Sequence, residues 1–179
     1  MTSCRMRRAL ILILTSASLV IVSPAAAGPV SAAAGPSRST ALAYAKRTFI
    51  VVAGVGNVPF KLGAQKSVTA NDGSTITAIS ITNDYGGTAD STHAALMLFR
   101  GGSFLGWASS RAGMFLTLEP SSGHAIRVSY PIWKATDPTC CPSGSKVVSY
   151  DWNGSRIVAN GQPPLIYGKP GILLHLSSG

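Results

Sequence analysis

The chain has 179 residues, with 15 Lys and Arg against 6 Asp and Glu, and 46% of its residues are hydrophobic while 12% are charged. This length suits one domain, which can bury a core without metals or many cross-links. Because the sequence shows no repeat period and spreads its Val, Ile, Leu and aromatic residues, we exclude collagen, coiled coils and wholesale disorder.

The N-terminus has the organisation of a secretory signal peptide. Arg5, Arg7 and Arg8 precede an uncharged apolar run, Ala9–Val22, and the small residues Ala25–Ala27 follow it. The run has about 14 residues, which is short of the roughly 20 that a membrane-spanning helix needs. The sequence therefore predicts an export signal and no transmembrane segment in the mature chain.

The composition divides the chain into three parts. We predict a signal peptide over residues 1–27, a flexible leader rich in Ala, Gly, Pro and Ser over 28–38, and a single β-rich domain over 39–179. Cleavage is expected after Ala27, with Ala34 as the alternative. Loss of residues 1–27 leaves 12 basic and 6 acidic side chains, a net charge of +6.

The position of Cys4 argues against a lipid anchor. A lipid-accepting cysteine stands at the end of the apolar run, where this chain has alanines, whereas Cys4 lies before the run. The predicted localisation is therefore secreted or cell envelope, without lipid anchoring.

The first element of the predicted domain is a helix. Ser39-Thr40 supplies a capping residue, and the following residues up to Arg47 are good helix formers. Leu42, Ala45 and Phe49 would share one face at helical spacing. Because Phe49–Val52 is rich in β-branched residues, a strand could begin there instead.

The middle of the chain changes to an alternating pattern that predicts strands. Thr75–Thr82 is a β-branched run between two polar turns. Ala94–Phe99 and Phe104–Ala108 predict a hairpin, with Gly101 and Gly102 as the turn residues.

A second hairpin is predicted from Val147–Trp152 and Ser155–Val158, joined by Asn153-Gly154, the strongest dipeptide signal for a tight two-residue turn.

Ile126–Ile132 also alternates, but Pro131 places it at a sheet edge or at a bulge. Residues 165–167 and 172–176 are weaker strand candidates. The predicted fold class is α+β or mostly β, an antiparallel sheet of short hairpin-connected strands with one N-terminal helix.

Two segments resemble the LppP/LprE family of actinobacterial envelope lipoproteins and their secreted relatives. One is Asp137–Gly144, which contains adjacent cysteines, followed by Val148–Gly154; the other is Leu98–Gly106, which resembles that family's Phe-x-x-Gly-x-x-Leu-Gly segment. The resemblance implies an envelope or secreted location and brings no established activity. Lipoprotein members carry a cysteine at the cleavage point, and this chain departs from that pattern.

Cys140 and Cys141 are the cysteines that remain after cleavage, in an oxidising compartment. They could form a vicinal disulfide, bond to another chain or stay reduced. Asp137, Pro138, Pro142 and Gly144 mark a rigid structural loop around them. We favour this structural role over a thiol-disulfide activity, because the prolines and the glycine mark a connection between a strand that ends near Trp133 and one that begins near Lys146. A bridge between neighbours would add little stability, since it closes almost no loop.

The sequence contains no other residue pattern typical of a catalytic, cofactor or metal site, and we predict no catalytic residues, cofactor or metal. The histidines His93, His124 and His175 show no metal-ligand spacing. The tryptophans Trp107, Trp133 and Trp152 and the tyrosines Tyr85, Tyr130 and Tyr150 could line a ligand surface, although aromatic residues of strands are more often core.

The sequence therefore predicts a secreted, envelope-associated, non-enzymatic domain with a binding or structural role. The first alternative is a thiol-disulfide module, and the second is a small hydrolase built on a histidine and an aspartate. The dispersed positive charge suits anionic envelope polymers, lipid headgroups or another envelope protein as partners. Nucleic acid is not expected, because no basic motif interleaved with aromatics is present.

Overall fold

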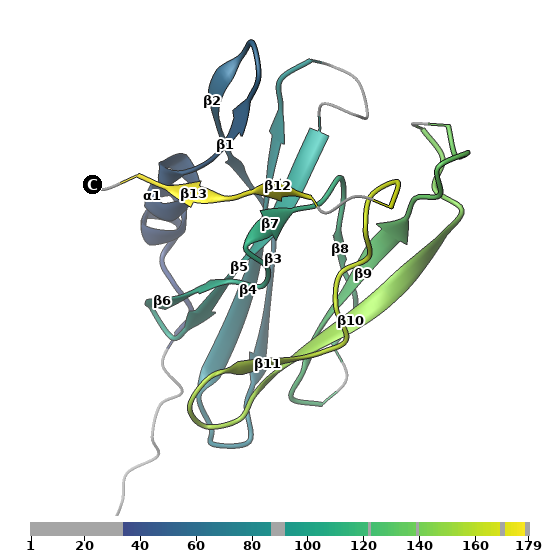
Figure 1. The fold of residues 1–179 in the computed structure, drawn as a ribbon. Helices are drawn as coiled ribbons and strands as arrows, with labels where there is room; N and C mark the ends of the chain where they lie inside the picture. Colours follow the sequence, from purple (N-terminus) through teal and green to yellow (C-terminus); the bar gives the residue numbers. More distant parts are fainter. Residues whose placement is uncertain (1–33, 87–91, 122, 139, 169–170, 178–179) are drawn as a thin grey trace, which may run out of the picture. The chain divides into compact units, whose positions relative to one another are not determined.

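Antiparallel strand pairing organises the residues that the computed structural model describes, which are 34–86, 92–121, 123–138, 140–168 and 171–177. The predicted signal peptide and residues 28–33 of the predicted leader lie outside the described residues. Within the described residues there are one helix and thirteen strands, most of them short, which confirms the predicted fold class (Figure 1).

The helix α1 (Arg38–Arg47) begins earlier than predicted. Its N-cap is Ser37, whose hydroxyl accepts a hydrogen bond from the backbone N–H of Thr40 at 3.1 Å, so the cap predicted at Ser39-Thr40 is wrong. The end of the predicted leader also packs on the domain, because Pro36 is buried and Gly35 lies directly against Thr77.

The face that α1 buries also differs from the prediction. Ala41 and Ala45 are buried, whereas Leu42 is 37% exposed and Phe49 belongs to β1 (Thr48–Val52). The small alanine side chains allow the helix to lie close to the rest of the domain, so the larger Leu42 is left at the surface.

The β3–β6 sheet has the strand order β3 (Lys61–Thr69), β4 (Thr75–Asp84), β5 (Thr92–Arg100) and β6 (Ser103–Trp107). It confirms the strand predicted over 75–82 and the hairpin predicted over 94–108. Gly101 and Gly102 form its two-residue connection, since Arg100 pairs with Ser103. Gly101 has φ 54°, which a type II′ turn requires at its first central residue.

The β8–β11 sheet has the strand order β11 (Ile157–Asn160), β10 (Gly144–Trp152), β9 (Ile126–Ile132) and β8 (Thr117–Leu118). The strand predicted over 126–132 is confirmed. The pairing of β9 with β8 ends at Ser129, so Pro131 lies beyond it, at an open edge as predicted.

The connection between β10 and β11 corrects the prediction of a two-residue turn. Trp152 pairs with Ile157, so the connection comprises residues 153–156 and β11 starts two residues later than expected. The side chain of Asn153 accepts hydrogen bonds from the backbone N–H groups of Ser155 and Arg156 at 3.1 and 2.9 Å. This local capping favours a wider loop over the tight turn that Asn-Gly usually indicates.

The remaining strands form two small ladders. One has the order β13 (His175–Leu176), β1, β2 (Gly56–Pro59), and the other pairs β12 (Ile172–Leu173) with β7 (Arg111–Ala112). The weak strand prediction over 172–176 is thus confirmed. The prediction over 165–167 is wrong, because Ile166 makes an isolated bridge with Trp133.

The central strands β4 and β5 of the β3–β6 sheet are buried on both faces. One face carries Ile79, Ile81, Met97 and Phe99 into a core that it shares with α1 and β1. The alternate residues of the same strands, including Ala78, Leu96 and Leu98, form a second core with the β8–β11 sheet. Figure 1 shows the resulting layers, with α1 on one side of the β3–β6 sheet and the β8–β11 sheet on the other.

Aromatic side chains fill the second core. Tyr130 and Tyr150 share a buried hydrogen bond of 2.8 Å between their hydroxyl groups, and burial raises the pKa of both phenols. Trp133 and Trp152 are buried as well, whereas Tyr85 and Trp107 are partly exposed. The core interpretation of these aromatic residues is therefore confirmed for most of them.

Candidate functional site

Asp72 ties the two large sheets together at one end of the second core. It lies in the turn between β3 and β4, where Oδ1 accepts hydrogen bonds from the backbone N–H and the hydroxyl of Ser74 at 2.9 and 2.5 Å. Its Oδ2 accepts the indole N–H of Trp152, the last residue of β10, at 2.8 Å. A carboxylate from the first sheet thus holds the end of a strand in the second.

Arg100 completes this cluster from the end of β5. Its guanidinium lies 3.2 Å from Oδ2 of Asp72 and 4.8 Å from the centre of the Trp152 ring. The guanidinium therefore combines an ion pair with a cation–π contact, and planar stacking of this kind favours Arg over Lys. The hydrogen bonds from Ser74, the indole of Trp152 and the charge of Arg100 lower the pKa of Asp72 from 3.8 to about 2.

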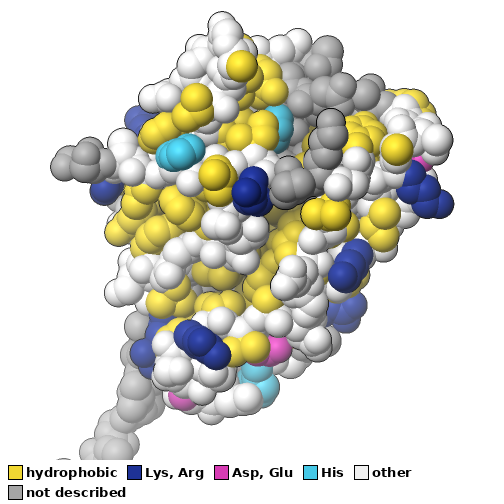
Figure 2. All heavy atoms as spheres, viewed as in Figure 1, with side chains coloured by type: hydrophobic (Ala, Val, Ile, Leu, Met, Phe, Trp, Pro, Cys, Tyr) yellow, Lys and Arg dark blue, Asp and Glu magenta, His cyan; other side chains and the backbone are white. Residues whose placement is uncertain are grey.

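A groove opens beside this cluster, between the edge strands β6 and β11 of the two sheets. Its cavity volume is about 290 Å³, close to the lower end of the range typical of small-molecule sites. Figure 2 shows hydrophobic side chains in the region between β6 and β11, with Lys and Arg at its margins. The lining residues are Leu98, Leu105, Gly106, Trp107, Ala108, Tyr150, Trp152, Ser155, Arg156, Ile157 and Ala159. We call this the β6–β11 groove.

A β-bulge shapes the β6 wall of the groove. The pairing of β5 with β6 shifts register between Leu98 and Phe99, which leaves Leu105 as the extra residue of β6. Bulges at sheet edges redirect side chains and end regular pairing. Here Leu105 is 40% exposed and lines both the groove and an adjoining surface hollow of about 370 Å³.

The adjoining hollow extends the groove to Arg100. Trp152 lines both spaces, and the hollow also includes Ser74, Thr75 and Ser103. Trp152 therefore separates the space next to Arg100 from the space next to Arg156.

Arg156 supplies the positive charge of the β11 wall. Its side chain is exposed and makes no ion pair within the part of the chain that the structure describes. The hydrogen bond from its backbone N–H to Asn153 fixes its place in the loop before β11. The guanidinium is thus available to a ligand in the groove.

Trp107 adds a hydrogen-bond donor to the β6 wall. Its ring packs edge-on against Phe104, with the ring centres 6.2 Å apart. Its indole N–H is buried and has no hydrogen-bond partner among the described residues. A buried donor without an acceptor is costly to the fold.

The predicted structural loop is organised by Asp137. Its carboxylate accepts hydrogen bonds from the backbone N–H groups of Lys134 at 2.7 Å and Ser143 at 2.9 Å, and also from the Ser143 hydroxyl. These bonds, with that from the Ser143 hydroxyl the largest cause, lower the pKa of Asp137. They hold the connection between β9 and β10 closed, and Pro138 and Pro142 lie inside it.

Cys140 and Cys141 lie on the exposed side of this loop, with their sulfur atoms in contact in disulfide geometry and their Cα atoms 3.8 Å apart. A shallow depression of about 280 Å³ beside Cys140 is lined by Phe115, Pro131, Trp133, Pro142 and Gly144, among others. The predicted loop residues thus lie in this connection or, for Gly144, at the start of β10, whereas the turn residue Asn153 follows the other end of the same strand.

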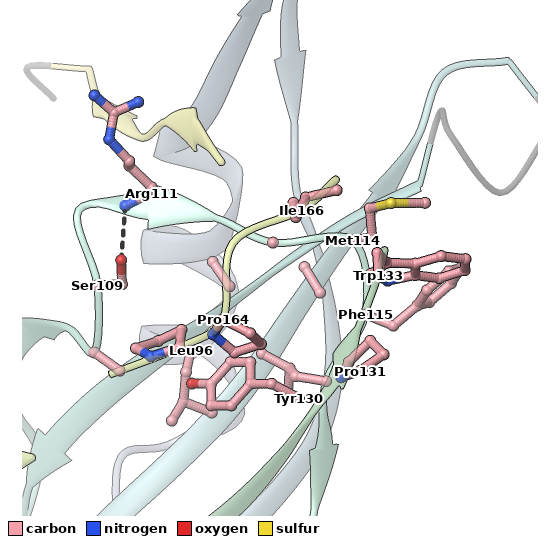
Figure 3. Close-up of a pocket in the computed structure, with 16 residues that line it drawn as sticks. Leu96, Ser109, Arg111, Met114, Phe115, Tyr130, Pro131, Trp133, Pro164 and Ile166 are labelled. Atoms are coloured by element: carbon pink, nitrogen blue, oxygen red, sulfur yellow. Dashed lines mark hydrogen bonds between the residues drawn. The ribbon is translucent and has the colours of Figure 1, made fainter. Parts of the chain in front are cut away.

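A narrow cavity lies on the inner side of Trp133. Figure 3 shows Phe115, Pro131 and Trp133 on one wall, with Pro164 and Ile166 on the segment that follows β11. Its volume of about 30 Å³ is suited to one or two water molecules, so it is much less suited to a ligand than the β6–β11 groove.

The histidines lie at separate places in the structure. His124 has Nδ1 2.6 Å from the carbonyl oxygen of Thr69, His175 stacks on Phe49, and His93 stacks on Tyr85. Within the described residues, no group of three His, Cys, Asp or Glu side chains is placed to hold a metal ion.

Sequence reasoning located the residues of this site without assembling them. From the sequence, Trp107 and Trp152 belong to two hairpins and to the aromatic residues that could line a ligand surface, whereas Arg100 is only a hairpin residue and Asp72 lies in a polar turn. The wider loop after Trp152 brings Arg156 to the groove. The position of Arg100 and Trp152 at strand ends next to turns is a signal of the site in the sequence. It does not specify which residues these two side chains contact.

Comparison with known proteins supports the family suggested by the two hairpin segments. A family model described as LppP/LprE lipoprotein matches residues 68–155. Those residues are LppP/LprE-like, which confirms the resemblance and indicates an envelope-associated protein. The matched segment includes Asp72, Arg100, Trp107 and Trp152 and ends just before Arg156. No curated protein and no solved structure matched this chain.

The described part of the chain has no helix with the length and apolar character needed to cross a membrane.

The lowered pKa of Asp72 predicts a pH-dependent stability. A carboxyl group with a lower pKa in the folded than in the unfolded state stabilises the fold above its unfolded pKa, near 4. This contribution is lost as the pH falls through about 2. We therefore expect Asp72→Asn to lower the melting temperature clearly at pH 7 and to lie much closer to the wild type at pH 2.

Thermal unfolding followed by circular dichroism between pH 2 and 7 measures this difference. Asp151→Asn is the matched control, because it removes one carboxylate from β10 outside the cluster. An equal pH-dependent difference in this control would contradict the role assigned to Asp72.

Proposed function

We propose that this protein is a secreted, envelope-associated and non-enzymatic domain that binds a ligand in the β6–β11 groove. The observation that carries the proposal is a groove whose walls come from different sheets and whose end is held by the Asp72, Arg100 and Trp152 contacts. Such fixed walls suit recognition, because a preformed site loses little conformational entropy on binding.

The groove favours binding over a catalytic role. Its lining contains Arg156, Ser155, two tryptophans and Tyr150, whose hydroxyl is already bonded to Tyr130, but no His, Cys, Asp or Glu side chain. General acid–base catalysis needs a titratable group within hydrogen-bond reach of the reacting atoms. Asp72 is close to Trp152, yet its oxygen atoms already accept hydrogen bonds from Ser74, Trp152 and Arg100.

Export is part of the proposal. The family match supports an envelope location, and the basic residues, apolar run and alanines at the N-terminus support a signal peptide that is cut after Ala27. The position of Cys4 before the apolar run supports export without a lipid anchor. Anionic envelope polymers, lipid headgroups or another envelope protein are the partners that the positive charge favours.

Export can be tested by identifying the first residue of the protein that is purified from its cell of origin. We expect peptide mass spectrometry to find a chain that begins at Gly28, or at Gly35 where cleavage follows Ala34. A functional form that retains Met1, or one that carries an acyl group, contradicts this part of the proposal.

Narrowing the groove should abolish binding. Ala159 pairs with the buried Tyr150 and lines the groove, so we expect Ala159→Phe to fill it without disturbing an exposed edge-strand position. Val158 pairs with Asp151, so its side chain points to the opposite face of β11. Val158→Phe is therefore a matched control that adds an aromatic ring to the same strand.

The measurement is mass spectrometry of molecules that remain bound after the protein is incubated with envelope extract and purified again. The wild type and Val158→Phe should retain the same molecule, and Ala159→Phe should lose at least nine-tenths of it, an estimate based on tenfold weaker binding for about 1.4 kcal/mol. Equal retention by all three proteins would show that the groove is not the binding site.

A thiol-disulfide module is the second candidate, and the exposed contact between Cys140 and Cys141 favours it. In such a reaction the protein disulfide would accept two electrons and two protons from an external dithiol, which would leave as a disulfide. The hydrogen bonds of Asp137 support a structural role instead, because they close the loop independently of the sulfur atoms.

Replacement of both cysteines distinguishes these roles. Because a bridge between neighbours closes almost no loop, we expect Cys140→Ala with Cys141→Ala to change the free energy of unfolding by less than about 1 kcal/mol. Ligand retention should also be unchanged. Urea unfolding and thiol counting after treatment with glutathione test this expectation, and loss of binding on reduction of the wild type would instead support the redox module.

A further inference from the structure

The class of ligand follows from the chemistry of the β6–β11 groove. Its inner wall is aliphatic and aromatic, with Leu98, Leu105, Ile157 and Ala159 beside the rings of Trp107 and Trp152. These side chains offer apolar contact area, and polar atoms make up a comparable share of the lining, which also includes Ser155, Arg156 and Tyr150. The apolar side chains favour a hydrocarbon chain as the part of the ligand that lies against them, because burial of apolar surface stabilises a complex.

The aromatic rings support the same choice. A sugar-binding platform needs an open aromatic face, but Trp152 is only 8% exposed and Arg100 covers its ring at 4.8 Å. The ring of Trp107 packs against Phe104. These rings therefore act as apolar walls.

The bulge in β6 argues against an added peptide strand. An extended peptide would pair with the backbone of an open edge strand, which requires regular spacing of donors and acceptors. The extra residue Leu105 interrupts this spacing in the middle of β6 and directs an apolar side chain to the groove instead.

Positive charge lies at two places along the apolar lining. Arg156 is exposed without an ion-pair partner among the described residues, and Arg100, which is shared with Asp72, lies on the other side of Trp152. The groove thus combines a row of apolar side chains with cationic groups on either side of Trp152.

We infer that the groove binds an anionic amphiphile, with its hydrocarbon chain between β6 and β11 and its acidic headgroup at Arg156. This inference rests on the proposed binding function and names the ligand class of the same groove. Among anionic amphiphiles, the inferred ligand is a lipid with an acidic headgroup. Arg156 attracts the acidic headgroup at the edge of the groove, and the aliphatic side chains bury the hydrocarbon chain.

Dodecanoate is the probe for the test, and its binding to the full mature chain is measured by titration calorimetry below the concentration at which it forms micelles. Dodecyltrimethylammonium has the same chain with the opposite charge, and acetate has the carboxylate without the chain. We expect dodecanoate to bind at least about fivefold more tightly than the cation, the effect of roughly 1 kcal/mol from an exposed charge pair. Acetate should show no saturable binding.

Chain length tests the apolar part of the inference. Each buried methylene contributes about 0.8 kcal/mol, so decanoate should bind about tenfold or more weakly than dodecanoate. An affinity that is independent of chain length would overturn the placement of the hydrocarbon chain in the groove.

Substitution of Arg156 tests the headgroup. Arg156→Ala keeps the backbone N–H that bonds to Asn153, and we expect it to weaken dodecanoate about threefold to fivefold while leaving the cation unaffected or bound more tightly. Arg38→Ala is the matched control, since Arg38 is an exposed arginine at the start of α1 and does not line the groove. Equal effects of the two substitutions would overturn the assignment of Arg156.

The outcomes separate this inference from the proposed function. Equal affinity for dodecanoate and for the cation would overturn the anionic headgroup. Failure of dodecanoate to bind, while Ala159→Phe still abolishes retention of a sugar or peptide from envelope extract, would overturn the amphiphile and leave the groove as the binding site. Dodecanoate binding that Ala159→Phe does not weaken would overturn both.

Discussion

The carboxylate of Asp72 is the interaction on which the site depends. It accepts the indole N–H of Trp152 and lies beside Arg100, so one side chain connects a turn of the β3–β6 sheet to the last residue of β10. The β6–β11 groove lies between the edge strands of the two sheets, and this contact joins the sheets next to it.

Two cores of different kinds stabilise this arrangement. The central strands β4 and β5 of the β3–β6 sheet are buried on both faces and contribute alternate side chains to each core. One core is closed by the alanine face of α1, which allows close approach. The other contains the hydroxyl pair of Tyr130 and Tyr150, a buried polar contact in which each hydroxyl has a partner. The site stands at the margin of this second core.

The two regions that looked functional in the sequence have different roles. The loop with Cys140 and Cys141 is held by the hydrogen bonds of Asp137, and its depression is shallow and open. The hairpin ends at Arg100 and Trp152 instead border the β6–β11 groove and its adjoining hollow. In the family-matched segment, the hairpins thus supply the residues of the candidate site, and the cysteine loop supplies a closed connection.

Local patterns determined the strands at 75–82, 94–99 and 126–132, because side-chain alternation and turn residues act over a few neighbours. The sequence also determined the family resemblance and the positive charge. The tertiary structure alone decided the contact between Asp72 and Trp152, because these residues are distant in the chain. It also decided the loop that places Arg156 at the groove, because the side chain of Asn153 competes there for backbone hydrogen bonds. A local pattern cannot specify which sheet edges will face each other, because that is set by packing of the shared core.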